Sequence, residues 1–112
     1  MGISTHVLDT ARGRPAVDVA ITLERENGGE WAPVSEARTD ADGRVPGLLP
    51  AGRAAEAGIW RLRFEVGDYF ERRGEPAFYP SIEVVFRIAE AGGHYHVPLL
   101  VSPFGYSTYR GS

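Results

Sequence analysis

The histidines are the side chains of this sequence best suited to acid–base chemistry. There are three, His6, His94 and His96, and an imidazole can take up and return a proton near neutral pH. His94 and His96 are two residues apart, so on a β-strand both point to the same side. Together with His6 they could instead form a zinc site with one open position. This zinc interpretation is the weaker one, because no spacing fixes the third ligand and no carboxylate that would orient the histidines is evident.

An arginine follows a tight turn in the first half of the chain. Asp40-Ala41-Asp42-Gly43 contains the Asp-Gly pair typical of a hairpin turn, which leaves Arg44 just past its tip. The guanidinium of Arg44 could fork onto a substrate carbonyl or an anion. The segment also resembles the start of a calcium loop, but Arg44 and Ala51 stand where oxygen ligands are required, which excludes calcium.

Other classes of chemistry lack their residues. The sequence has no cysteine, which excludes a disulfide framework, a thiolate metal site and a cysteine nucleophile. Serine-hydrolase and phosphate-loop motifs are absent. The formal net charge of −3 argues against a nucleic-acid partner, because that interaction needs clustered positive charge. No segment approaches the ~20 apolar residues that span a bilayer and the first residues lack the build of a signal peptide, so we expect no membrane partner and a cytoplasmic location.

The elements that must position these residues are predominantly β-strands. In stretches such as Val17–Glu24 and Trp60–Val66, large apolar residues alternate with polar ones, which is typical of strands with one buried face. Gly-, Asp- and Pro-rich turns separate these stretches. Eight strands fit, over residues 3–9, 16–25, 31–38, 43–46, 58–67, 80–89, 93–102 and 105–110.

One short helix is expected from Asp68 to Arg73, with Asp68 as its N-cap. The 112 residues contain no linker or repeat, so we expect a single domain over residues 1–112. The predicted fold class is all-β, an eight-stranded antiparallel sandwich of two sheets with one short helix.

The predicted strand over residues 93–102 lacks a charged face. Its odd-numbered residues from 95 to 101 are large and apolar, and its even-numbered residues, His94, His96, Pro98, Leu100 and Ser102, are also poor in charge. A strand without a charged face is usually covered on both sides. The core of a sandwich covers only one side, so we expect a second copy of the chain to cover the other, with the histidines inside the contact.

Longer motifs at both ends of the chain are more specific. They are His6-Val7-Leu8-Asp9, Gly13-Arg14-Pro15-Ala16, Asp42-Gly43-Arg44, His94-Tyr95-His96-Val97-Pro98-Leu99-Leu100-Val101-Ser102-Pro103 and Tyr109-Arg110-Gly111-Ser112. Together they resemble the transthyretin-like 5-hydroxyisourate hydrolases, from residue 3 to the last residue. The resemblance implies an eight-stranded prealbumin-type sandwich, a homotetramer, and active sites in the channel where two dimers meet.

The resemblance also implies a reaction in urate (purine) catabolism. The six-membered ring of 5-hydroxyisourate would be opened by water to give 2-oxo-4-hydroxy-4-carboxy-5-ureidoimidazoline. The catalytic residues of the family match His6, Arg44 and His96. The terminal tetrapeptide, which closes the site in the family, supplies Tyr109, Arg110 and Ser112 as substrate-binding residues.

The residue types agree with this reaction. Opening a cyclic amide needs a nucleophilic water, a donor to the carbonyl oxygen on which negative charge grows, and a proton for the departing nitrogen. Two imidazoles and an arginine supply all three without a metal or other cofactor. We expect His6 and His96 to share water activation and proton transfer and Arg44 to polarise the carbonyls. The residue types do not decide which histidine is the base.

Two alternatives come from other classes of protein. The first is a non-catalytic small-ligand carrier of the same fold, but the hormone-carrier branch of the resembled family has different residues at positions 6, 44 and 96. The second is an adhesion module, because Thr39–Val45 resembles a turn of B-type collagen-adhesin domains. Those modules often carry a lysine–asparagine crosslink, and this chain has no lysine.

Overall fold

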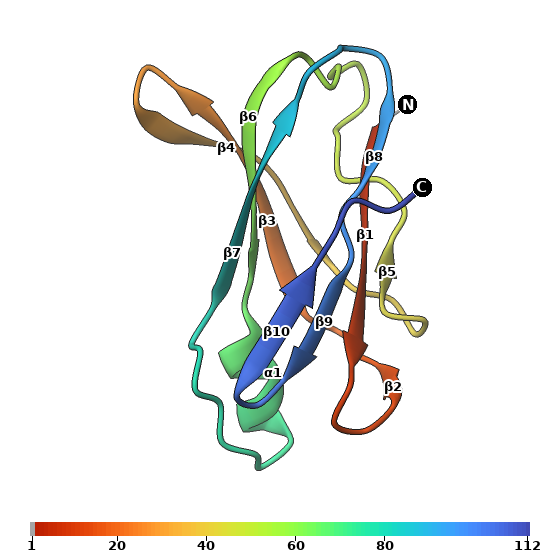
Figure 1. Cartoon of the computed structure of the whole chain (residues 1–112), viewed down its shortest axis with the longest axis vertical. Coiled ribbons are helices and arrows are strands. Elements are labelled where there is room, and N and C mark those ends of the chain that lie inside the picture. The colour runs from red at the N-terminus through yellow and green to blue at the C-terminus, as the bar shows by residue number, and fades with distance from the viewer. Residues whose placement is uncertain (1) are drawn as a thin grey trace.

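The computed structural model describes residues 2–112 as two β-sheets with one short helix (Figure 1). The six-stranded sheet contains β1 (Gly2–Asp9), β2 (Arg14–Pro15), β5 (Arg44–Val45), β8 (His94–His96), β9 (Leu99–Ser102) and β10 (Gly105–Thr108). The other sheet has the order β4 (Glu30–Arg38), β3 (Ala20–Asn27), β6 (Gly58–Phe64), β7 (Ile82–Ile88). The predicted two-sheet, predominantly β architecture is confirmed.

The eight predicted strands are all present, although residues 2–112 form ten strand segments. Pro98 has no backbone N–H to give to a ladder, and the predicted strand over residues 93–102 is divided there into β8 and β9. Arg14 and Pro15 add the two-residue strand β2, which pairs with the end of β1. The sequence therefore predicted the main strands but not the break between β8 and β9 or the additional short strand β2.

The direction of pairing in the six-stranded sheet differs from the all-antiparallel prediction. β1 runs parallel to both β8 and β9, with Ser4 beside His96 and Val7 beside Leu99. Alternation of apolar and polar residues is the same in both kinds of sheet, so it could not reveal this direction. As a result, the first strand lies beside the strand that carries His94 and His96.

Helix α1 (Val66–Arg72) begins two residues before the predicted start. Its N-cap residue is Glu65, without a side-chain capping bond, so the predicted capping role of Asp68 is wrong. Asp68 lies in the first turn, where a negative charge suits the helix dipole. The buried side chains of Val66, Tyr69 and Phe70 set the helix position through packing. In the part of the chain that the structure describes, no helix is long and apolar enough to cross a membrane.

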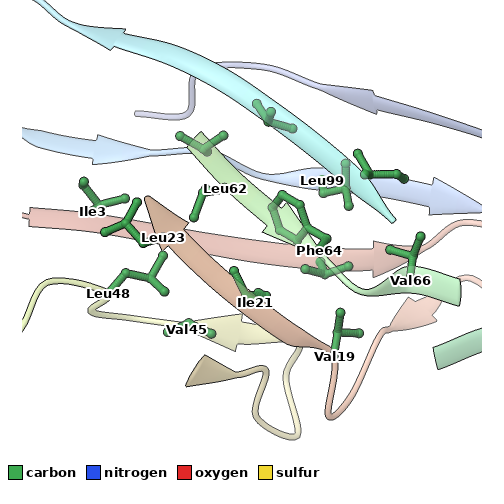
Figure 2. Packing of buried hydrophobic residues seen from close by; sticks show 14 of the residues in the cluster. Ile3, Val19, Ile21, Leu23, Val45, Leu48, Leu62, Phe64, Val66 and Leu99 are labelled. Carbon is green, nitrogen blue, oxygen red and sulfur yellow. The ribbon is translucent and has the colours of Figure 1, made fainter. Parts of the chain in front are cut away.

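Apolar side chains from both sheets fill the space between them. Figure 2 shows Ile3 and Leu99 of the six-stranded sheet in one layer with Leu23, Leu62 and Phe64 of the other. Ile3 points into this core, and side chains alternate along a strand. The even-numbered residues of β1 therefore face the outer side of the six-stranded sheet, where the site is found.

A buried carboxylate anchors the far end of β1. Asp9 has no exposed surface, and its carboxylate accepts hydrogen bonds from the hydroxyl of Tyr69 at 2.9 Å and from the backbone N–H of Ala11 at 3.1 Å. The pKa of Tyr69 is raised chiefly by burial and also by its hydrogen bond to Asp9. These bonds tie β1 to α1, so the strand that carries His6 is held at its end.

Candidate active site

Three predicted catalytic residues meet on the outer face of the six-stranded sheet. His6 of β1 is in register with Arg44 of β5, and Ser4 of β1 is in register with His96 of β8. Ser4 and His6 are two residues apart, so they share one face of β1. Because neighbouring strands lie about 4.8 Å apart, this register brings both imidazoles and the guanidinium-bearing residue to one small area of the sheet.

His6 is half-buried and its ring is held by the turn before β5. The Nε2 atom of His6 lies 2.9 Å from the carbonyl oxygen of Asp42. A carbonyl can only accept, so Nε2 carries the hydrogen of this bond. In a neutral His6 ring, Nδ1 is then the nitrogen that is free to accept a proton.

The turn that presents Arg44 is ordered by a carboxylate. One carboxylate oxygen of Asp40 accepts hydrogen bonds from the backbone N–H groups of Asp42 and Arg44, both at 2.9 Å. The backbone hydrogen bond from Arg44 is the main cause that lowers the pKa of Asp40, and the nearby charges of Arg44 and His6 act in the same direction. Asp40 therefore stays ionised and supplies a negative charge beside Arg44 and His6.

His96 is half-buried and has a defined partner for one ring nitrogen. Its Nδ1 atom lies 2.8 Å from the hydroxyl of Ser4. Burial is the first cause that lowers the pKa of His96, followed by the positive charges of His6, His94 and Arg44. Near neutral pH these effects favour a neutral ring that can accept a proton.

The C-terminal segment reaches His96 through its backbone. The N–H of Gly111 donates to the carbonyl oxygen of His96 at 2.8 Å. A Cβ atom at position 111 would lie only 2.5 Å from Cδ2 of the His96 ring. Gly111 is thus packed against the imidazole, and the last residue, Ser112, follows directly and is exposed.

The other two residues of the closing tetrapeptide lie elsewhere within this chain. The guanidinium of Arg110 stacks over the ring of Tyr95, with 4.8 Å between them. Tyr95 points to the opposite side of β8 from His96. Arg110 and Tyr109 line a hollow of about 230 Å³ beside β7 and β8. The single chain therefore does not bring Tyr109 and Arg110 onto the histidine face.

Ser4 and Asp40 belong to the site but were not predicted from the sequence. Ser4 lies between His94 and His96, and Asp40 holds the turn before Arg44. A signal for Ser4 was present, because it stands two residues before His6 on the same strand. It was not informative without the parallel register that places β8 beside β1.

The geometry of the three histidines does not suit a zinc ion. Among residues 2–112, no group of three histidine, aspartate or glutamate side chains is arranged to hold a metal. Nε2 of His94 and Nδ1 of His96 both form hydrogen bonds with the Ser4 hydroxyl. These two nitrogens are thus engaged by a hydrogen-bonding group rather than directed at a common metal position.

Gly43→Ala is expected to destabilise the fold by about 1–3 kcal/mol and to lower activity by displacing Arg44. Gly43 has φ +76°, and a Cβ there would lie 2.5 Å from the backbone oxygen of Val7, a strand atom that cannot move aside. Urea unfolding and steady-state kinetics measure the two effects. The matched control is Gly28→Ala, at φ +63° with nothing within 4 Å of the added Cβ. Equal losses in the two variants would contradict the role of this contact.

Comparison with known proteins places this chain in a family. Residues 3–111 match the model of the HIUase/Transthyretin family. A 5-hydroxyisourate hydrolase of Ralstonia nicotianae is 50% identical over 114 residues, covering 98% of this chain and 97% of that protein. One of Mesorhizobium japonicum is 49% identical, covering 98% and 91%.

Solved structures show the same fold. The 5-hydroxyisourate hydrolase of Klebsiella pneumoniae has a TM-score of 0.87 and 36% identity, and covers 100% of both chains. Sea bream transthyretin in complex with thyroxine has a TM-score of 0.91 and 31% identity, over 99% of this chain and 95% of that one. The chain therefore belongs to the HIUase/Transthyretin family.

Proposed function

We propose that this protein is a 5-hydroxyisourate hydrolase, which opens the six-membered ring of its substrate with water in urate catabolism. The observation that carries the proposal is the meeting of His6, Arg44 and His96 on one outer face of the six-stranded sheet. Full-length relatives named 5-hydroxyisourate hydrolase support it. The fold alone does not, because a thyroxine-bound transthyretin is at least as similar in structure.

The two imidazoles divide the proton transfers. His96 is the base: its pKa is lowered chiefly by burial, and with Nδ1 engaged by Ser4, Nε2 takes a proton from the attacking water. Arg44 donates hydrogen bonds to the carbonyl oxygen on which negative charge develops. The carbon–nitrogen bond of the ring amide then breaks, and protonated His6 gives its Nδ1 proton to the departing nitrogen.

The surroundings of His6 support the role of acid. The carbonyl of Asp42 accepts from Nε2, and the charge of His6 is one of those that lower the pKa of Asp40. A protonated His6 beside the cationic Arg44 is therefore offset by the negative charge of Asp40.

The complete site belongs to a homotetramer. The outer sheet face around the histidines carries Leu8 and Leu100, both partly exposed in the single chain, and neighbouring copies would cover it. In that assembly Tyr109, Arg110 and Ser112 would close the site over the substrate. Light scattering at micromolar concentration should give four chains per particle, whereas a stable monomer would contradict this assembly.

The activity test uses substrate made in place. Urate and urate oxidase generate 5-hydroxyisourate, and its absorbance decay is followed with and without this protein, before and after exhaustive chelation. We expect faster decay in both conditions. No acceleration over the spontaneous decay would contradict the hydrolase, and ligand binding without turnover would indicate a carrier. Loss of activity on chelation, with recovery on adding zinc, would indicate a zinc hydrolase.

A further inference from the structure

The Ser4 hydroxyl bridges two imidazoles on the outer face of the sheet. Its Oγ lies 2.8 Å from Nδ1 of His96 and 2.9 Å from Nε2 of His94. Ser4 is only 6% exposed, His96 is half-buried, and His94 is exposed to solvent. The three side chains thus form a continuous hydrogen-bonded path from the interior of the site to its surface.

The backbone holds this bridge in place. Ser4 and His96 are in register between the parallel strands β1 and β8, and the N–H of Val97 donates to the Ser4 carbonyl at 2.9 Å. His94 and His96 point to the same side because they are two residues apart on β8. The pairing of β1 with β8 therefore fixes the hydroxyl between the rings.

A hydroxyl has one proton to donate, so it links the protonation of the two rings. If Ser4 donates to Nδ1 of His96, it must accept from Nε2 of His94, and if it donates to His94 it must accept from His96. The second arrangement leaves Nε2 of His96 unprotonated and able to act as a base. The first leaves Nε2 of His96 protonated. Once Nε2 of His96 has gained a proton, a shift of two protons through Ser4 carries the added charge from His96 to His94, and loss of the Nδ1 proton of His94 completes the conversion of the second arrangement into the first.

We propose that Ser4 is a positioning residue that connects His96 to His94, so that the proton His96 takes from water leaves the site through His94. The inference rests on the proposed hydrolase function and extends it to two residues outside the catalytic trio. Ser4 links the tautomer of His96 to that of His94, and His94 is the exit.

The protons balance along this path. Nε2 of His96 gains a proton from water while the remaining hydroxide forms the new bond to the carbonyl carbon. The Nδ1 proton of His96 then moves to Ser4, the Ser4 hydroxyl proton moves to Nε2 of His94, and Nδ1 of His94 releases one proton to solvent. After the product leaves, Nδ1 of His94 takes a proton from solvent, the two protons shift back through Ser4, and Nε2 of His96 releases a proton to the water that enters the site, which restores the base. His6 gives a proton to the departing nitrogen and regains one from solvent. The new carboxylic acid ionises, so one proton is released per turnover.

The charges around His96 favour such a transfer. His6 on β1, Arg44 on β5 and His94 on β8 face it, and each disfavours a positive charge on its ring. Asp40 is the nearby negative group, beside His6 and Arg44. Arg110 stacks on Tyr95, on the other side of β8. His94 is exposed in the single chain, so moving the charge from half-buried His96 to His94 places it where water solvates it, provided that the neighbouring copies leave the His94 edge of this face open.

The test compares three variants by turnover and by proton NMR of the imidazoles. Ser4→Ala removes the bridge, and Ser4→Thr retains a hydroxyl. His94→Gln keeps an N–H donor for Ser4 but cannot carry a proton. Ser81→Ala, a serine outside the site, is the matched control, and circular dichroism verifies folding of each variant.

We expect Ser4→Ala to lower kcat by about 10- to 100-fold and to move the acidic limb of the pH profile. Ser4→Thr should recover most of that loss. His94→Gln should lower kcat at low buffer concentration, with recovery when imidazole is added as an external proton acceptor. An unchanged kcat and pH profile in Ser4→Ala, or an unchanged kcat in His94→Gln at low buffer, would overturn the relay.

The NMR arm needs no substrate, so it separates this inference from the proposed function. In the unmodified protein, the His94 and His96 rings should titrate as a linked pair, and Ser4→Ala should abolish the linkage. Independent titration of the two rings in the unmodified protein would overturn the inference even if the hydrolase activity is present. A linked pair in a protein without activity would uphold the bridge and contradict the hydrolase.

Discussion

His96→Asn should lower kcat by about 10²–10⁴-fold, the range expected when a general base is lost. The pKa of half-buried His96 is lowered chiefly by burial, so its ring is neutral near neutral pH and can accept a proton. Asparagine places an amide close to the position of Nδ1 and can keep the bond to Ser4, but it has no atom equivalent to Nε2. Steady-state kinetics with 5-hydroxyisourate measure the loss, and urea unfolding verifies that the fold is retained.

The pH dependence gives this prediction a second readout. A base must be neutral, so kcat/KM should fall as the pH drops through the pKa of His96. That pKa lies below the ordinary value of 6.5, so activity should persist to a lower pH than an unperturbed histidine allows. This fall of kcat/KM at low pH should be absent from the residual activity of His96→Asn. Near-normal turnover of a folded His96→Asn variant would contradict the assignment of the base.

Arg44→Ala should lower kcat by about 10²–10³-fold, the loss expected when a donor to the developing oxyanion is removed. Arg44 is in register with His6, so its side chain starts beside the proposed acid. Arg44→Lys retains the charge but not the planar fork of N–H donors. It should recover only part of the activity if paired hydrogen bonds to carbonyls matter.

The control for Arg44 is an arginine outside the site. Arg53 forms an exposed ion pair with Glu56 at 3.2 Å, and such pairs contribute little. Arg53→Lys should therefore keep full turnover, and light scattering should show an unchanged assembly in all three variants. Full turnover in Arg44→Ala would remove the arginine from the mechanism.

The sequence was informative about strands and weak about their pairing. Alternation over Trp60–Val66 correctly predicted a half-buried strand, since Trp60, Leu62 and Phe64 have no exposed surface. The same pattern cannot distinguish parallel from antiparallel neighbours. The parallel pairing of β1 with β8 joins residues about ninety positions apart, and no local pattern encodes a contact at that separation.

The site was predictable as a set of residue types but not as a geometry. His6, Arg44 and His96 were chosen through resemblance to a family and do share one face of the sheet. Their catalytic roles stay predictions. The Ser4 bridge was out of reach because it depends on the register between strands. Arg110 was also chosen through the resemblance, as a substrate-binding residue of the closing motif. Within one chain, however, it stacks on Tyr95, away from the histidines.

The most direct test of the account is a crystal structure with a slowly reacting analogue of 5-hydroxyisourate. The account predicts difference density on the outer face of the six-stranded sheet, with the carbonyl oxygens near Arg44 and the ring amide between His6 and His96. Density confined to the hollow lined by Tyr95, Tyr109 and Arg110, with the histidine face empty, would contradict it.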